Sequence, residues 1–133
     1  MIIRCRLTYN EITQKYCMEN FEHDLTKTKS YFVLQIHYLA DGLYYRLVEQ
    51  QGSEINHPIL VKLDFFSLVS GKIPNTWALS QKDKEYAVLG PEKWSNPNNW
   101  KKDFWDAYFE GNAEAIKCYK EELEIVKETD KDF

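Results

Sequence analysis

Three carboxylates near the C-terminal end of the chain are spaced so that they could act together. Asp103, Asp106 and Glu110 are three and four residues apart, which places them on one face of a helix. Carboxylates in this arrangement can serve acid/base chemistry, or they can simply meet the solvent. The sharper hypothesis is an acidic patch that docks a basic partner and speeds its association.

Tryptophans gather in the same part of the chain. Aromatic residues make up 15% of the sequence, and the four tryptophans lie close together, at Trp77, Trp94, Trp100 and Trp105. A domain of this size can bury few such large rings completely, so some should reach the surface, where Trp supplies much of the energy of protein interfaces. Core packing is the simple alternative for each ring. The predicted partner-binding site has two anchors and a negative rim: Trp100 and Trp105 with Asp103, Asp106 and Glu110.

Cysteine and histidine are the other residues with potential chemistry. A cysteine nucleophile needs a nearby histidine to lower its pKa, and a fold could bring His37 near Cys5 or Cys17. Cys5 on a strand and Cys118 on an amphipathic helix are explained more simply as core residues. Cys17 and His23 do not make a metal-binding motif, and the five glycines are scattered at turn-like positions. The sequence predicts no catalytic residue, no metal and no cofactor.

Composition and charge narrow the function further. The chain has 133 residues, of which 44% are hydrophobic and 29% charged, as in a single globular domain. No apolar run is long enough to span a membrane, and the cysteines do not suggest a disulfide framework, so we expect a cytoplasmic protein. The net charge is −4. Residues 1–99 hold 11 acidic and 11 basic side chains, and residues 100–133 hold 10 acidic and 6 basic ones, so binding to nucleic acid is not expected.

A β-hairpin is the clearest local signal. Two β-rich runs in residues 31–50 flank Asp41-Gly42, a dipeptide suited to the two-residue loop of a type I′ turn. With that loop, Tyr38 opposes Tyr45. The hairpin face that carries Tyr38 is expected to form core, and the mixed face that carries His37 is expected to be partly wet.

Other segments complete the predicted fold. Residues 10–29 carry only a weak helical pattern. Strands are expected over residues 1–7 and 58–63, a short helical turn capped by Asp64 over 65–70, and a second hairpin from 77–80 and 86–89. Late in the chain, Asn96 and Pro97 predict the start of a helix that includes residues 100–110, and Asn112 predicts the cap of another, whose end frays after residue 128. Strands followed by helices predict a single α+β domain over residues 1–133, an antiparallel β-sheet with C-terminal helices packed on one face.

Aromatic and turn residues give the last 75 or so residues a family resemblance. The motifs are Val61-Lys62-Leu63-Asp64-Phe65-Phe66, Gly71-Lys72-Ile73-Pro74, Trp77, Pro91, Trp94, Pro97, Trp100, Phe104-Trp105, Tyr108-Phe109, Gly111-Asn112 and Ala115. In a short, acidic and aromatic chain, they resemble small bacterial proteins of the toxin-immunity type. The resemblance implies a protein that binds a toxin domain stoichiometrically and blocks its active site, often with carboxylates against a basic nuclease cleft. It implies no particular residue roles, and residues 1–57 do not share it.

Three functions therefore stand as hypotheses. The first is a non-catalytic, stoichiometric protein-binding module, such as an immunity protein that neutralises a bacterial toxin by binding a basic toxin domain. The second is a small enzyme with a pocket assembled from scattered residues, such as His37 with Cys5 or Cys17. The third is a self-associating structural module that uses the mixed face of the hairpin in residues 31–50.

Overall fold

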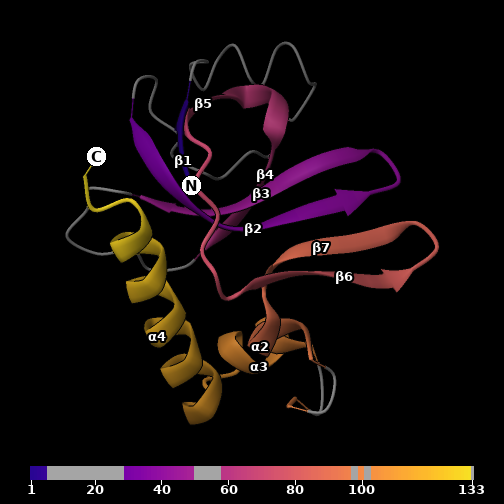
Figure 1. Ribbon diagram of the computed structural model, residues 1–133. Coiled ribbons are helices and arrows are strands. Elements are labelled where there is room, and N and C mark those ends of the chain that lie inside the picture. The colour runs from indigo at the N-terminus through magenta and orange to yellow at the C-terminus, as the bar shows by residue number, and fades with distance from the viewer. Residues whose placement is uncertain (6–28, 50–57, 97–98, 101–102, 133) are drawn as a thin grey trace.

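The computed structural model describes residues 1–5, 29–49, 58–96, 99–100 and 103–132. Within these ranges, seven strands form one antiparallel sheet and three helices near the C-terminal end pack against it (Figure 1). The predicted α+β architecture is confirmed. Apart from residue 29, the segment 10–29 with its weak helical pattern lies outside the described residues. No helix in the described ranges is both long and apolar enough to cross a membrane.

The sheet is organised around one long strand, β2 (Ser30–Leu39). On one side β2 pairs with β3 (Gly42–Glu49), which pairs with β4 (Ile59–Lys62). On its other side the first part of β2 pairs with β1 (Ile2–Cys5), which pairs with β5 (Phe66–Ser70). The resulting order is β4-β3-β2-β1-β5.

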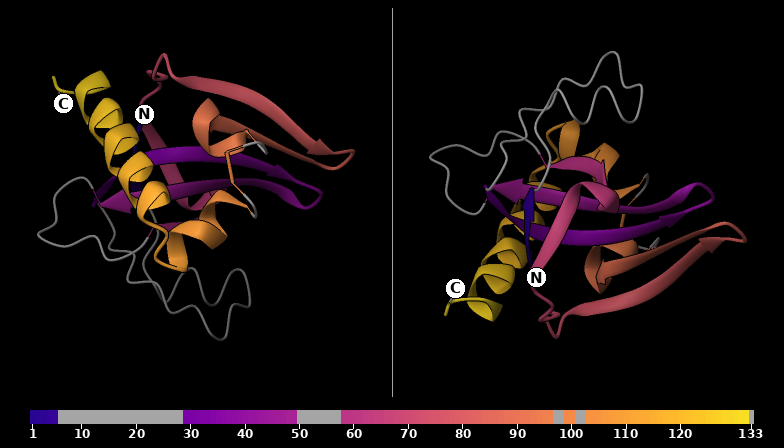
Figure 2. Two further views of the ribbon diagram at one scale, coloured as in Figure 1. Left: turned by 90° about the horizontal axis from the view of Figure 1, so that it is seen from below. Right: turned by 90° about the horizontal axis from the view of Figure 1, so that it is seen from above.

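The second half of β2 has a different neighbour on that same side. There β2 pairs with β7 (Tyr86–Pro91), and β7 forms a hairpin with β6 (Trp77–Asp83). The sheet therefore forks at β2, with β1 and β5 on one branch and β7 and β6 on the other. Both hairpins, β2–β3 and β6–β7, project in the same direction away from α4 (Figures 1 and 2).

The turn of the first hairpin differs from the prediction. The loop consists of residues 40–41, and Gly42 takes its positive φ of 136° as the first residue of β3, opposite Leu39. This moves the pairing by two residues, so Tyr38 opposes Leu43 and not Tyr45. Gly42 can adopt a positive φ because it has no Cβ atom. The sequence did not show whether Gly42 would lie in the loop or at the start of the next strand.

The segment predicted as a helical turn over 65–70 is instead mostly strand. A single 3₁₀ turn, η1 (Leu63–Phe65), is followed directly by β5, and no side chain caps that turn. β5 pairs with β1, with Phe66 opposite Cys5. Backbone hydrogen bonding to β1, a partner far away in the sequence, replaces the local bonds of a helix.

The first of the two predicted late helices starts later than predicted, and the second starts where predicted. The segment around Asn96 forms a single turn, α2 (Glu92–Ser95), and Asn96 is its C-cap and not an N-cap. Helix α3 (Phe104–Phe109) begins only after Asp103, whose carboxylate accepts a hydrogen bond from the Trp105 N–H. Helix α4 (Ala113–Thr129) begins as predicted after Asn112, whose side chain accepts a bond from the Ala115 N–H.

The end of α4 is held in place, contrary to the expected fraying. Asp130 is buried, and its carboxylate accepts a hydrogen bond of 2.6 Å from the Ser70 hydroxyl. The other carboxylate oxygen lies 2.5 Å from the Met1 amine. A buried carboxylate needs such partners, and they fasten α4 to β5 and β1.

The helices cover the sheet face that was expected to be wet. Trp105 of α3 donates a hydrogen bond to the side chain of Gln35, and Gln35 and His37 are 4% and 3% exposed. The opposite face has its own ring cluster, in which Tyr31 and Tyr45 both contact Phe66 at 6.0 Å. The sheet thus has buried side chains on both faces, and the helix layer lies over the mixed one.

Candidate partner-binding surface

The aromatic residues of the three helices mainly form an internal cluster. Trp94 of α2 stacks on Phe104 at 4.8 Å and meets Trp105 edge-on at 5.3 Å. Tyr119 of α4 lies 6.0 Å from Trp94 and 4.7 Å from Tyr108. Trp94, Phe104, Trp105 and Tyr119 are buried, so these rings join the helices to one another.

The two predicted anchors therefore differ. Trp105 is only 6% exposed, and it belongs to the core and not to a contact surface. Trp100 lies before the start of α3 and is half-buried. Its indole N–H donates to the Lys93 carbonyl at 3.0 Å, and its ring meets Phe104 edge-on at 5.2 Å. Among the four tryptophans, Trp100 keeps the most surface, in a fixed orientation.

The three predicted carboxylates also have distinct positions. Asp103 is the N-cap of α3, so part of its hydrogen-bonding capacity serves the helix. Asp106 lies in the first turn of α3 and Glu110 is its C-cap. All three residues are exposed, and the negative charge they bring faces solvent.

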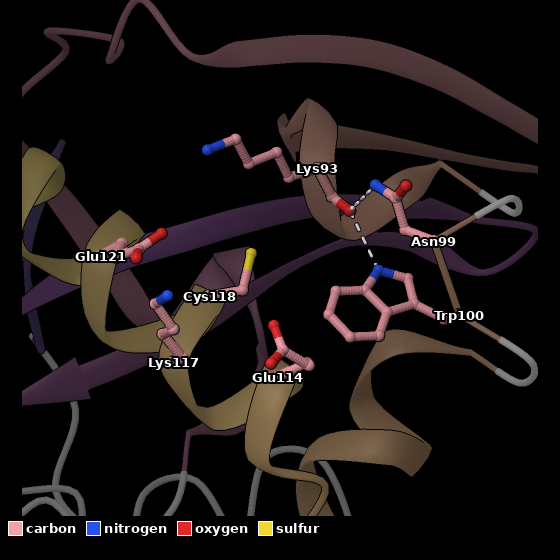
Figure 3. A pocket seen from close by; sticks show the side chains of 7 residues that line it. All are labelled: Lys93, Asn99, Trp100, Glu114, Lys117, Cys118 and Glu121. Atoms are coloured by element: carbon pink, nitrogen blue, oxygen red, sulfur yellow. Dashed lines mark hydrogen bonds between the residues drawn. The ribbon is translucent and has the colours of Figure 1, made fainter.

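A hollow of about 340 Å³ opens beside Trp100, between the segment after α2 and helix α4 (Figure 3). The indole ring forms one wall, and α4 forms the other. Asn99 also donates to the Lys93 carbonyl, at 3.2 Å, so two side chains fix this part of the chain. The residues that line the hollow are Lys93, Asn99, Trp100, Glu114, Lys117, Cys118 and Glu121.

Carboxylates from α4 contribute the negative charge of this hollow. Glu114 and Glu121 are exposed, and neither forms an ion pair with another residue in the described ranges. Figure 3 shows the Glu114 carboxylate beside the indole ring and below the Cys118 sulfur. Burial and the charge of Glu122 raise the pKa of Cys118, which keeps it a thiol and a poor nucleophile.

None of these α4 residues was among the predicted site residues. Glu114, Cys118 and Glu121 are four and three residues apart, which is the spacing of one helix face. That periodic signal was available. What the sequence lacked was the position of Trp100, because the indole reaches α4 only once the chain after α2 has turned back.

A second group of polar residues lies under the helices. The Trp105 indole N–H donates to Gln35 Oε1 at 2.7 Å, and His37 Nε2 lies 3.0 Å from the same oxygen. The amide oxygen of Gln35 can only accept, so His37 Nε2 carries the proton. His37 Nδ1 then accepts from the Tyr86 hydroxyl at 2.9 Å. The result is one chain of hydrogen bonds across β2, β7 and α3.

This network is closely packed. Gly90 faces Gln35, and a Cβ atom at that position would lie 2.5 Å from Gln35 Cγ. The Arg46 guanidinium lies over the Trp105 ring, 4.7 Å from its centre. Burial and the positive charge of Arg46 lower the pKa of His37 to about 4, so the imidazole is neutral at pH 7.

The network leaves little space for a substrate. The cavity among these side chains has a volume of about 10 Å³, roughly that needed for a single water molecule. Cys5, the proposed partner of His37, lies opposite Phe66, and Phe66 contacts Tyr45 on the sheet face away from His37. The pairing of Cys5 with His37 is therefore wrong, and Cys17 lies outside the described residues.

No group of three or more histidine, cysteine, aspartate or glutamate side chains is placed to hold a metal ion in the described part of the chain. Comparisons of the chain with protein-family models, with curated proteins and with solved structures give no match.

Proposed function

We propose that this protein is a non-catalytic binding module that holds one copy of a partner protein at the hollow beside α4. The observation that carries the proposal is Trp100, a large ring that is held by two neighbours yet still forms the wall of an open hollow. Rings that are already ordered lose little entropy on binding, and tryptophan is enriched among the residues that dominate interface energies.

Charge indicates the kind of partner. The Glu114 carboxylate lies beside the indole without an ion-pair partner among the described residues, and a lysine or arginine side chain could lay its alkyl stem on the ring and its cation on this carboxylate. Lys93 and Lys117 also line the hollow, so positive and negative side chains alternate around it. We therefore expect the hollow to bind one basic side chain of the partner and not several. Asp106 and Glu110 on α3 add negative charge that attracts a basic protein over longer distances.

A basic toxin domain fits this description. The resemblance to immunity proteins supports the same partner class, as does the acidic excess of residues 100–133. In this function the cytoplasmic protein would occupy the toxin's basic cleft in a complex of one copy each.

The test begins with recovery of the partner from the native host, followed by calorimetry with the purified partner. Trp100→Ala should weaken binding at least ~30-fold, as expected for a hot-spot residue. Glu114→Gln should weaken it less, and Asp106→Lys with Glu110→Lys should mainly slow association and reduce its dependence on salt. Trp100→Tyr should retain part of the affinity.

Leu68→Ala is the matched control, because Leu68 is 61% exposed on β5 and does not line the hollow. Its affinity should equal that of the unchanged protein. Unchanged affinity in both Trp100→Ala and Glu114→Gln, with circular dichroism showing that each is folded, would reject the proposed site. If the partner is a toxin, one equivalent of this protein should abolish its activity, and residual activity at saturation would reject the inhibitory role.

A further inference from the structure

A second hollow lies on helix α4, beyond the one beside Trp100. It has a volume of about 620 Å³, and it opens between the second half of α4 and the chain that connects β5 to β6 (Figure 1). Ile73 of that connection is 51% exposed, and Ile125 of α4 lines the same hollow. The second hollow therefore presents apolar surface to solvent.

The two hollows share one face of α4. Five α4 residues on that face follow one another at spacings of four, three, four and three, which keeps them in line along the helix. They are Glu114, Cys118, Glu121, Ile125 and Glu128. The first three line the hollow beside Trp100, and the last two line the hollow beside Ile73. We call these five residues the α4 seam.

The walls opposite the α4 seam are also connected. The Thr76 hydroxyl, just after the segment that lines the second hollow, donates a hydrogen bond of 2.9 Å to Glu122 of α4. The Thr76 carbonyl accepts a bond of 3.0 Å from the N–H of Glu92, the first residue of α2. The next residue, Lys93, lines the hollow beside Trp100. The two hollows are thus the ends of one groove along α4.

The ends of this groove differ in chemistry. At the Trp100 end, the Glu114 carboxylate lies beside the indole ring and forms no ion pair within the described ranges (Figure 3). At the other end, Glu124 and Glu128 pair with lysines three residues later, at 3.5 and 3.0 Å, and the apolar surface is isoleucine. One end suits a cation and the other suits an apolar side chain. Glu114 and Ile125 are eleven residues apart, roughly 16.5 Å along the helix axis.

We infer, on the basis of the proposed function, that the partner contributes one helix to this groove and that the helix lies along α4 and uses both hollows. Alternating spacings of four and three are those with which one helix faces another. A strand would have no edge to pair with, because the main chain of α4 is already hydrogen-bonded within the helix. The partner helix contains an apolar side chain for the Ile73 end and, eleven residues away on the same face, a lysine or arginine for Trp100 and Glu114.

Two alanine-based helical peptides test this inference. Both contain one leucine near the N-terminus and one arginine nearer the C-terminus. In the first peptide these residues are eleven apart and share a face, and in the second they are nine apart and lie on opposite faces, since a helix turns once in about 3.6 residues. Calorimetry with the unchanged protein should show that the first peptide binds at least ~5-fold tighter than the second.

Variants at each end of the groove should remove this difference. Ile73→Lys and Trp100→Ala each take away the contact at one end, and Ile73→Ala should act in the same direction as Ile73→Lys without adding a charge. Leu79→Lys is the matched control, because Leu79 of β6 is 74% exposed and lines neither hollow. It should bind the two peptides as the unchanged protein does, and circular dichroism should show that every variant is folded.

Equal binding of the two peptides, or no binding of either up to ~1 mM, would overturn the inference. Peptide binding that Trp100→Ala abolishes and Ile73→Lys leaves unchanged would also overturn it, while the proposed function would stand. With the purified partner, equal affinities in Ile73→Lys and Leu79→Lys would lead to the same conclusion. The proposed function fails on a different result, unchanged partner affinity in both Trp100→Ala and Glu114→Gln.

Discussion

The paired strands β2 and β7 present two faces with opposite environments. Gln35 and His37, the polar residues, are covered by the helices, whereas Tyr38 on the other face is more than half exposed. Both of these side chains have hydrogen-bond partners, so their burial costs little. The apolar face is buried around Tyr31 and Phe66, but Tyr38, where β2 pairs with β7, stays exposed. At Gln35 and His37, burial depends on hydrogen-bond partners and not on hydrophobicity.

The largest effect is expected from removing the ring that covers the polar face. Trp105→Ala deletes a buried indole that packs on Trp94 and Phe104 and donates to Gln35. The free energy of unfolding should fall by about 3–5 kcal/mol, measured by urea denaturation. Trp105→Phe should cost less, because it keeps most of the packing and loses the hydrogen bond. A loss below ~1 kcal/mol for Trp105→Ala would mean that this ring is not part of the core.

The hydrogen-bond network can be broken with little change in volume. Gln35→Leu removes the oxygen that accepts from both Trp105 Nε1 and His37 Nε2, and leaves two buried donors without that acceptor. The free energy of unfolding should fall by about 2–4 kcal/mol, since each unsatisfied buried donor costs about 1–3 kcal/mol. Denaturation with urea measures it. A neutral or stabilising effect would show that the polar side chains on this face are replaceable by apolar ones.

Acid should weaken the covered face through His37. Its pKa is about 4 in the folded protein, and an unfolded histidine has a pKa of about 6.5. As the pH falls from about 6.5 toward 4, the unfolded chain gains a proton that the folded protein does not, so stability falls by roughly 2–3 kcal/mol. Denaturation midpoints at several pH values measure the slope.

His37→Gln supplies the comparison for the pH series, because it removes only this titration. Its stability should change less between pH 6.5 and pH 5 than that of the unchanged protein. Identical slopes in the two proteins would contradict a neutral, buried imidazole.

The smallest effect is expected on the sheet face away from the helices. Leu79→Lys alters a side chain that is 74% exposed, and the free energy of unfolding should change by less than ~0.5 kcal/mol. Urea denaturation measures it. A loss of more than ~1 kcal/mol would show that Leu79 packs within its own chain.

Local patterns were sufficient for much of the fold. Two short β-rich segments, 77–80 and 86–89, predicted the hairpin of β6 and β7, and Asn112 predicted the start of α4. The choice of covered face was not predictable, because it rests on a bond between Gln35 and Trp105, which are 70 residues apart. The strand β5 was missed for a similar reason, since it pairs with β1, which lies far earlier in the sequence.

The candidate site was predicted only in part. Trp100 and Trp105 belong to one aromatic segment, and both were predicted to be anchors for a partner. They differ because α3 begins at Phe104, which turns Trp105 into the helix layer and leaves Trp100 in the preceding segment. The start of α3 depends on the Asp103 cap, and the sequence offered Asn96 as a competing cap.

The fork at β2 has a consequence for hydrogen exchange. β2 has neighbours along both sides, with β3 on one and first β1, then β7 on the other. Separation of either branch leaves the other branch and β3 still bonded to it. The amide protons of Val33 to Tyr38 should therefore exchange only when the whole domain unfolds, whereas those of β4 and β6, at the outer ends of the sheet, should exchange through smaller openings.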